Sequence, residues 1–564
     1  MSTFTFSNFY ILESLPATES QTGTELGSRI NLWALSQGVD CQVDILQVHS
    51  MQEWEMAWKE IYSGIENVRA IPIIHLEMHG NNEFIGIDSC AKGMIPINDV
   101  FRKVQHANIL SKNSVFLSMA ACMGLNVLLR NLEVYEPMPF CGVLGPVATL
   151  KNDNLLEDYT IFYKALLTTQ NLYKAEQIMK ESGVDAMKYE LYKPEQIFMS
   201  AFVSYLETYQ TDEQIVTKAM EAAACRDIDF QFDEDRNRFV RDYRVSLFLN
   251  EDKDYQRSVS SFFMFDRYPE ITNRFSIPLS LFAFKQIAGK NGYKWLLEKR
   301  PLTFDDKKVL SIQILHVVDD FCVKNGINYS LAYGTLIGAI RHHGFIPWDD
   351  DVDIMMMRPD FERFVALFNH DVSKPFSVAS YETDGDFHFP MAKVSCNATN
   401  NEELGFNKYG YAIDVFPIDK FPSGEKELSK VLKKKSRYWN LMALKAMRWN
   451  KARSLRKNLV MSLSKTIVNL IPYSSIHRLM RKDVAKYEQL NNDYLLGCFY
   501  TPYGGRDVLP KACFDSFIKI EYEKTYFPVI KSYDVFLSSV YGDYMQLPPE
   551  EKRVTHHGFN AYWK

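Results

Sequence analysis

The stretch YGTLIGAIRHHGFIPWDDDVD, residues 333–353, decides how this chain is interpreted. Its last five positions hold four carboxylates, at 349, 350, 351 and 353. Carboxylates a few ångströms apart raise each other's pKa, and a divalent cation removes that conflict. Together with the nearby Gly-Thr pair, arginine and Pro-Trp pair, the acidic cluster indicates a metal-dependent phosphate site. An acidic turn ahead of a buried strand is the alternative interpretation.

The segment DVDIMMM, which begins at Asp351, alternates carboxylates with apolar residues. On a β-strand, Asp351 and Asp353 project from one face while the apolar side chains between them enter the core. Carboxylate oxygens paired in this way suit Mg²⁺ or Mn²⁺, whose remaining ligands are waters and substrate phosphate oxygens. We expect a turn at Gly334 and Thr335 on the phosphate side, because glycine allows close backbone approach and the hydroxyl can hydrogen-bond.

Two further blocks accompany this stretch: IDVFPIDKFP at 413–422 and YGDYMQLPPEEKRVTHHGFNAYW at 541–563. In content and in order, the three blocks resemble the LicD family, which is named for phosphorylcholine transfer and is related to fukutin-type proteins. The resemblance implies an α+β domain of the nucleotidyltransferase fold over residues 301–564. It also implies transfer of a phospho-linked, phosphorylcholine-like group from a nucleotide-activated donor to a hydroxyl of a glycan or lipid-linked acceptor.

The resemblance assigns roles to individual carboxylates. Asp351 and Asp353 would hold the metal with a third carboxylate on a neighbouring strand, and Asp414 lies at the matching place in IDVFP. Asp414 is also our candidate for the base that accepts the proton of the attacking hydroxyl. Asp349 and Asp350 precede the alternating segment, so we expect them in a loop outside the ligand set.

Seven residues are predicted substrate contacts, drawn from the first block, from the strand-like MAKVS and from the last block: Gly334, Thr335, Arg341, Lys393, Arg553, His556 and His557. For Lys393 the alternative is a solvated charge on a strand. For the last three it is a polar tail that packs on the domain.

A basic region interrupts an otherwise acidic chain of net charge −6. Residues 426–482 hold sixteen Lys or Arg and the single acid Glu427, with no Pro or Gly before Pro472, which predicts a helical insertion. Basic amphipathic helices lie on anionic membranes, so an inner-membrane face is one interpretation and a solvated basic face is the other. No nucleic-acid-binding motif accompanies the charge, and we expect no nucleic-acid partner.

Composition sets outer limits on location and chemistry. The chain has 564 residues, 46% of them hydrophobic, which predicts two or three folded domains. It has no run of about 18 uncharged apolar residues and no basic segment with a cleavage site at its start, so we expect a cytoplasmic protein. Its nine cysteines include no CxxC pair, which favours neither a disulfide framework nor a thiolate zinc site.

The first 170 residues contain four strand-like apolar runs separated by helix-like stretches: VDILQV, IPIIHLEMHG, SVFLSMAACMG and PFCGVLGPVATL. This alternation predicts a parallel α/β sheet. His79 ends one run and Cys122 ends the next, and side chains at the carboxyl ends of parallel strands face the functional crevice. A histidine beside a cysteine can stabilise the thiolate that a cysteine nucleophile requires.

The HG after one strand and the AC-x-G after the next resemble the caspase-like fold, in particular its CHAT branch. The resemblance covers residues 1–170 and implies a cysteine-peptidase dyad of His79 and Cys122, although such folds also serve as inactive scaffolds. Glu77 and Asp88 are nearby acids to which the sequence assigns no position. Residues 171–300 are predicted to form a helical connector.

Three interpretations remain open. The chain is a LicD-like transferase whose first domain is regulatory or binds a protein partner; or a cysteine protease effector controlled by a nucleotide-binding C-terminal domain; or a binding module in which neither site is catalytic.

Overall fold

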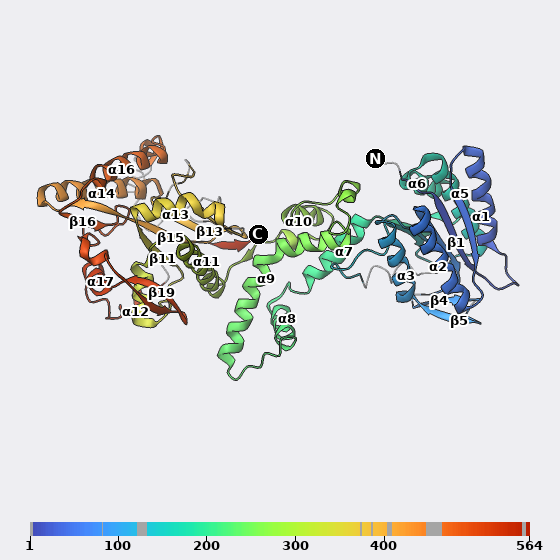
Figure 1. The fold of residues 1–564 in the computed structure, drawn as a ribbon, viewed down its shortest axis with the longest axis horizontal. Coiled ribbons are helices and arrows are strands. Elements are labelled where there is room, and N and C mark those ends of the chain that lie inside the picture. Colours follow the sequence, from blue (N-terminus) through green and yellow to red (C-terminus); the bar gives the residue numbers. More distant parts are fainter. Residues whose placement is uncertain are drawn as a thin grey trace, which may run out of the picture. The chain divides into compact units, whose positions relative to one another are not determined.

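The computed structural model describes residues 4–81, 83–88, 90–120, 132–372, 375–384, 387, 389–402, 409–446, 465–554 and 560–564. The chain divides into two compact units, which are considered separately (Figure 1). The first comprises Met1–Lys218 and Asn250–Glu298, and the second comprises Ala219–Leu249 and Lys299–Lys564. The predicted connector, 171–300, therefore contributes residues to both units.

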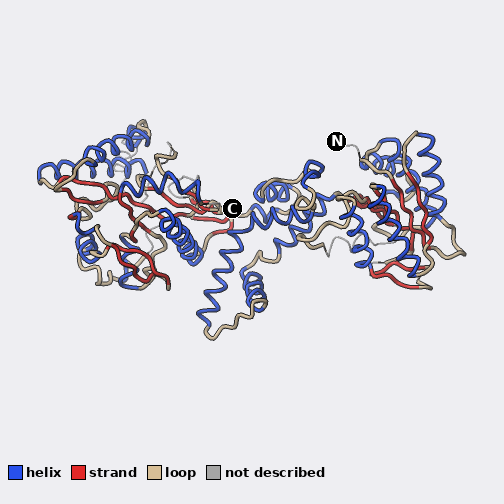
Figure 2. Tube along the Cα trace, in the orientation of Figure 1, coloured by secondary structure: helices blue, strands red, loops and turns tan. Residues whose placement is uncertain are grey.

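The first unit contains the parallel sheet that the apolar runs predict, in the strand order β2-β1-β3-β6-β7-β8. Figure 2 shows its strands in red among helices in blue. Every neighbouring pair is parallel except β7 with β8. The strands are β1 (Asn8–Ser14), β2 (Gln42–Gln47), β3 (Pro72–Met78), β6 (Phe116–Met119), β7 (Gly142–Pro146) and β8 (Tyr189–Tyr192). Strand β8 belongs to the stretch that was predicted to be a helical connector, so that prediction is wrong for these four residues.

Helices cover the sheet because alternate strand residues turn to opposite faces. Phe9 and Ile11 of β1 join the core formed with α1 (Thr22–Gln37) and α5 (Asn152–Thr169). Tyr10, between them, points to the opposite face of the sheet and contacts Gly64 of α2 (Met51–Val68). Helix α2 packs against α3 (Ile97–Leu110). The unit also contains a hairpin and further helices: β4 (Phe84–Ile87), β5 (Gly93–Pro96), α6 (Leu172–Ser182), α7 (Pro194–Glu207) and α10 (Leu281–Lys290). Helices α8 (Asp212–Ala224) and α9 (Asp233–Phe262) each have residues in both units.

The second unit is built on a mixed sheet in the order β10-β11-β15-β13-β12, which continues through β16 and β17. Its strands are β10 (Ser330–Leu331), β11 (Asp353–Met357), β12 (Phe376–Ala379), β13 (Ala392–Cys396), β15 (Ala412–Pro422), β16 (Tyr494–Gly497) and β17 (Leu509–Pro510). Strands β11 and β15 are parallel, whereas β13 runs antiparallel to β15. This α+β arrangement agrees with the predicted class of the C-terminal region.

Helices and two smaller sheets complete this unit. The helices are α11 (Phe304–Asn325), α12 (Tyr333–His342), α13 (Arg358–Asp371), α14 (Glu425–Ala446), α16 (Tyr473–Glu488) and α17 (Tyr533–Tyr541). The smaller sheets pair β14 (Thr399–Asn401) with β20 (Ala561–Trp563) and β9 (Arg300–Pro301), and β18 (Phe517–Tyr522) with β19 (Thr525–Ile530).

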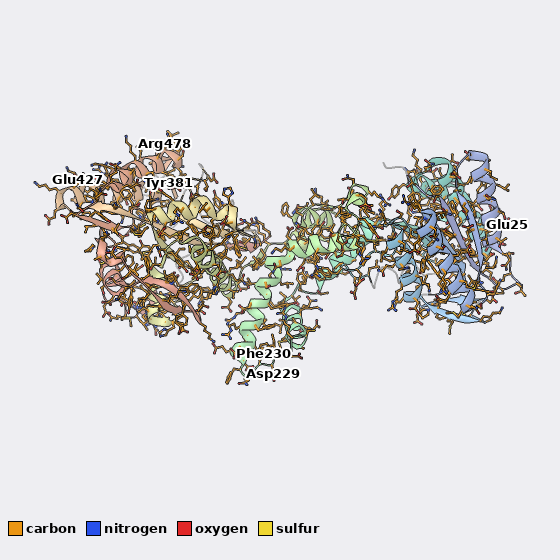
Figure 3. All side chains as sticks on the ribbon, viewed as in Figure 1. Glu25, Asp229, Phe230, Tyr381, Glu427 and Arg478 are labelled. Carbon is orange, nitrogen blue, oxygen red and sulfur yellow. The ribbon has the colours of Figure 1, made fainter. Side chains whose placement is uncertain are left out.

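The basic region is helical where it is described, as predicted, and residues 447–464 lie outside the described part. Figure 3 shows Glu427 on α14 and Arg478 on α16. Several cations are engaged inside the unit: Lys434 pairs with Asp483 on α16, and the buried Lys435 pairs with Asp507 at 2.8 Å. Among the described residues, no helix is both long enough and apolar enough to cross a membrane.

Candidate functional site

Asp353 and Asp414 face each other in register on the parallel strands β11 and β15. Val352 and Ile354 are fully buried, whereas Asp353 is only half-buried, so the predicted alternation of the segment is confirmed. The strand begins at Asp353 rather than at Asp351. Asp351 nevertheless stays close to the ladder, because the carbonyl oxygen of Val352 accepts the backbone N–H of Asp414 at 2.9 Å.

Four carboxylates crowd the start of these two strands. The pKa of Asp351 is raised well above its ordinary value, mainly by burial and then by the negative charges of Asp353 and Asp349. Burial, followed by the charges of Asp414 and Asp349, raises the pKa of Asp353 in the same way. Asp349 therefore belongs to the cluster, although the sequence placed it with the loop carboxylates outside.

Asp350 differs from its neighbours. Its carboxylate is buried and forms an ion pair with Lys307 of α11, with 2.7 Å between Oδ2 and Nζ. Its backbone carbonyl accepts the hydroxyl of Tyr411. Asp350 thus anchors the acidic loop to the helix beneath it, and its neighbours on either side turn toward the cluster.

The clustered side chains offer carboxylate oxygens to a divalent cation. In the described part of the chain, no three His, Cys, Asp or Glu side chains are arranged around one point as ligands of a metal ion. The carboxylates are close enough to raise each other's pKa, and Asp349 and Asp351 are within hydrogen-bond reach of each other. Their chemistry fits Mg²⁺ or Mn²⁺, which take hard oxygen ligands.

Gly334 and Thr335 lie in the first turn of α12, so the predicted turn at these residues is wrong. Thr335 is buried, and its hydroxyl oxygen accepts the backbone N–H of Asp353 at 2.8 Å. A Cβ on Gly334 would lie 3.2 Å from Oδ2 of Asp349, which shows how closely the acidic loop packs on the start of the helix. Backbone N–H groups at a helix N-terminus favour anions, so α12 presents its positive end beside the carboxylates.

Lys393 is part of the same cluster. It lies opposite Asp414 on β13, and its Nζ is 2.7 Å from Oδ1 of Asp414. Its side chain is 10% exposed and its Nζ lies 4.3 Å from the ring centroid of Phe389. The alternative of a solvated charge is therefore wrong. The cation also acts to lower the pKa of Asp353, against the carboxylates that raise it.

The arginines predicted as substrate contacts have other partners. Arg341, in the last turn of α12, donates to the backbone carbonyls of Tyr544 (2.6 Å) and Gln546 (3.3 Å), which indicates a structural anchor rather than the predicted substrate contact. Arg553 donates to the carbonyl of Pro548 at 2.9 Å and lies over the ring of Trp348, close to the acidic loop. His556 and His557 lie outside the described residues.

Five tyrosines surround the carboxylates, and sequence reasoning did not single out any of them as a ligand contact: Tyr333, Tyr411, Tyr503, Tyr522 and Tyr541. The charges of Asp351 or Asp353 help raise the pKa of Tyr411, Tyr503, Tyr522 and Tyr541. No local pattern indicates this arrangement, because the tyrosines come from separate loops, helices and a strand.

In the first unit, His79 follows β3 and its Nε2 is 2.8 Å from Oε2 of Glu19. The same oxygen accepts the side-chain amide of Asn152 at 3.1 Å. Cys122, the predicted partner of His79, lies outside the described residues. Asp88 contacts His49 instead, with 2.8 Å between Oδ1 and Nδ1.

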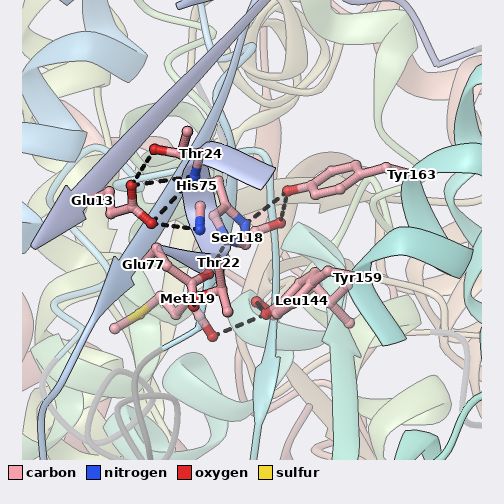
Figure 4. A network of polar contacts seen from close by, with 11 residues as sticks. Glu13, Thr22, Thr24, His75, Glu77, Ser118, Met119, Leu144, Tyr159 and Tyr163 are labelled. Atoms are coloured by element: carbon pink, nitrogen blue, oxygen red, sulfur yellow. Dashed lines mark hydrogen bonds and ion pairs between the residues drawn. The ribbon is translucent and has the colours of Figure 1, made fainter. Parts of the chain in front are cut away.

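Glu77 does not orient His79 either. It is buried in a separate network, where it meets Nε2 of His75 at 2.8 Å and accepts the Thr22 hydroxyl at 2.7 Å (Figure 4). The network continues from His75 to Tyr163, whose hydroxyl donates to Ser118 at 2.7 Å. Because these buried polar groups satisfy one another's hydrogen-bonding capacity, the network fits a structural role inside the sheet.

Comparison with known proteins identifies the class of the second unit. Residues 326–420 match the family model described as LicD/FKTN/FKRP, nucleotidyltransferase domain. This range includes β11, most of β15 and the four clustered carboxylates. The matched range contains the first of the three sequence blocks and most of the second, whereas the third, at 541–563, lies beyond it.

Individual relatives narrow this class. Over 270 residues, in its C-terminal half, the chain is 33% identical to the lipopolysaccharide cholinephosphotransferase LicD of Haemophilus influenzae, covering 47% of this chain and 99% of that protein. An uncharacterized protein of Rickettsia prowazekii is 31% identical over 117 residues, which are 21% of this chain and 42% of that protein. The chain belongs to the LicD family. The caspase-like resemblance of residues 1–170 lies outside the family match and stays a prediction.

Proposed function

We propose that the C-terminal half transfers a phosphorylcholine-type group from a nucleotide-activated donor to a hydroxyl of a glycan, as in lipopolysaccharide. The observation that carries the proposal is the register of Asp353 with Asp414, at the centre of four crowded carboxylates, in a chain that aligns with 99% of a cholinephosphotransferase. The reaction class follows from the family, and the residues below give it a mechanism.

Asp351, Asp353 and Asp414 are the proposed ligands of Mg²⁺ or Mn²⁺, with Asp349 beside them. When bound, the ion neutralises the carboxylates and the donor phosphates. Positioning and charge neutralisation supply most of the catalysis in phosphoryl transfer, because the protein has little covalent chemistry to perform. The N–H groups at the start of α12 add a fixed positive field on the same side.

Asp414 is the proposed base. A bond forms between the acceptor hydroxyl oxygen and the transferred phosphorus, and the bond from that phosphorus to the nucleotide phosphate oxygen breaks. The nucleoside monophosphate leaves, and the hydroxyl proton passes to Asp414. Lys393 contacts Oδ1 of Asp414, so it orients this carboxylate and leaves Oδ2 to face the reacting groups.

Donor consumption followed by ³¹P NMR tests the transfer. The full chain is incubated with Mg²⁺, cytidine-activated donors and a lipopolysaccharide-type glycan, beside the Asp351→Asn/Asp353→Asn double variant. The exposed Asp515→Asn variant is the matched control. We expect a new phosphodiester resonance with the native chain and with the control only. Equal donor consumption by the double variant would refute the assignment of these carboxylates.

A cysteine-peptidase activity of the first unit is a second proposal, which would make the unit proteolytic rather than only regulatory. The observation that favours it is His79 at the carboxyl end of β3, held by Glu19. Cleavage of protein substrates that is lost in His79→Ala and retained in Asp351→Asn would support it. If both variants still cleave the substrates, this second proposal is contradicted.

A further inference from the structure

Two of the five tyrosines around the carboxylate cluster reach the surface. Tyr541 is 37% exposed and Tyr503 is half-buried, whereas the other three are at most 2% exposed. Tyr541 is the last residue of α17, and Tyr503 lies in the loop between β16 and β17. These two rings are therefore the ones that a ligand at the cluster can touch.

The positions of both rings are fixed by contacts to the start of α12. The ring of Tyr503 stacks on that of Tyr333, with 5.2 Å between centroids and 26° between planes. The ring of Tyr541 meets Tyr503 edge to face at 5.6 Å, and the two hydroxyl oxygens are 2.8 Å apart. Tyr333 in turn contacts Phe416, which lies two residues beyond Asp414 on β15 and hence on the same face of the sheet. The pair thus stands beside the face that carries Asp414.

The carboxylates near the pair favour a cation. Asp353 and Asp351 lie near enough to contribute to the raised pKa of both tyrosines. The exposed Arg506 places its guanidinium carbon 5.7 Å from the ring centroid of Tyr503, within the range of a cation–π contact. Tyrosine faces and nearby carboxylates together make the arrangement that recognises quaternary ammonium groups.

We propose that Tyr503 and Tyr541 bind the trimethylammonium head of the transferred group, and so set the preference of the site for choline. The inference rests on the proposed transfer, whose substrate class it specifies. In phosphorylcholine, two methylene groups separate the ester oxygen from the nitrogen, so the cation stays close to the transferred phosphorus. The base of the donor lies beyond a second phosphate and a ribose. Rings beside the carboxylates are accordingly placed for the ammonium head.

The test compares CDP-choline with a neutral isostere in which carbon replaces the quaternary nitrogen. Binding to the full chain in Mg²⁺ is measured by calorimetry, and transfer is measured in parallel. We expect the native chain to bind CDP-choline about tenfold more tightly than the isostere. The Tyr541→Phe variant, which keeps the ring, should retain most of this ratio, and Tyr541→Leu should lower it to the smaller share that the carboxylates and Tyr503 supply.

Two controls separate the rings from other sources of selectivity. Carboxylates alone also favour a cation, but their contribution survives in Tyr541→Leu, so a ratio that stays at the native value in this variant would overturn the inference. Arg506→Gln removes the neighbouring guanidinium and should leave the ratio in place. Tyr503→Phe, which keeps the stack on Tyr333, reports on the hydroxyl pair without removing a ring, and it too should keep the ratio.

The outcomes also distinguish this inference from the proposed function. Equal binding of the two donors by the native chain, together with transfer from both, overturns the choline assignment and leaves the transferase standing. A tenfold preference without transfer to any glycan counts against the proposed transferase and leaves a choline-binding site. Weaker binding of both donors to Tyr541→Leu at an unchanged ratio would show a purely structural role for the ring.

Discussion

Lys393 and Asp414 face each other across the antiparallel strands β13 and β15, and their side chains form an ion pair with 2.7 Å between Nζ and Oδ1. The pair joins the largely buried ammonium group of Lys393 to the proposed base. Its arrangement gives Asp414 a fixed orientation that neither strand would impose alone.

Replacement of Lys393 tests this orientation. We expect Lys393→Met to lower kcat by about 10²-fold, because a mispositioned base loses most of its contribution to proton transfer. The apparent affinity for Mg²⁺ should stay equal or rise, since a positive charge has been removed beside the ligands. Steady-state kinetics at several Mg²⁺ concentrations measures both, and Lys393→Arg is the charge-retaining control. A weaker Mg²⁺ response at unchanged kcat would contradict the proposed role.

Thermal unfolding in chelator and in Mg²⁺ tests the metal site. Without a cation the four carboxylates repel one another. Mg²⁺ at 100 times its Kd should therefore raise the free energy of unfolding by about 2.7 kcal/mol and Tm by about 5–10 °C. In chelator, Asp351→Asn should melt slightly above the native chain, because one repelling charge is gone. It should lose most of the Mg²⁺ response, while Asp515→Asn keeps it. An equal response in all three proteins would exclude this cluster as the site.

Arg341 provides a test that separates stability from substrate binding. Its Nη1 donates to the carbonyls of Tyr544 and Gln546 while its Nε donates to His342, a pair of separate donors that a lysine cannot reproduce. We expect Arg341→Lys to lower the free energy of unfolding by about 1–3 kcal/mol and to leave KM for the donor unchanged. Denaturant unfolding and donor kinetics measure the two effects, with the exposed Arg437→Lys as control. A raised KM at native stability would restore the substrate role that the sequence predicted.

Thiol labelling tests the predicted dyad in the first unit. A thiolate stabilised by His79 should react with iodoacetamide faster than an ordinary exposed thiol. We expect Cys122 to be labelled faster than the exposed Cys90 and Cys225, and His79→Ala to remove this advantage. Peptide mapping by mass spectrometry gives the three rates in one sample. If Cys122 reacts no faster than Cys90, the dyad prediction fails.

Local patterns predicted much of the fold, because buried parallel strands are continuous apolar runs that local sequence reveals. The strand with Asp353 and the strands β2, β3, β6 and β7 of the first unit were found in this way. Strand β1 was missed: NFYILES is buried along its whole length but mixes polar with apolar residues, so neither alternation nor an apolar run is visible.

The site was only partly predictable for a different reason. Asp414 and Lys393 lie on strands, where the register of the sheet brings them to Asp353. Asp349 joins the cluster because the loop packs on the start of α12, and Tyr503 and Tyr541 arrive from loops and helices far along the chain. Such contacts depend on tertiary packing, which a single sequence does not display. The Gly-Thr pair was predicted as a turn because glycine allows close backbone approach to a phosphate, but in the structure the pair lies in the first turn of α12.

The most direct test of the central claim is the mass of a defined lipopolysaccharide-type glycan after incubation with the full chain, Mg²⁺ and CDP-choline. The account predicts that the glycan gains one phosphorylcholine with the native chain and none with Asp353→Asn, while Asp515→Asn behaves as the native chain. A glycan of unchanged mass, with CDP-choline hydrolysed equally by the native chain and by Asp353→Asn, would contradict it.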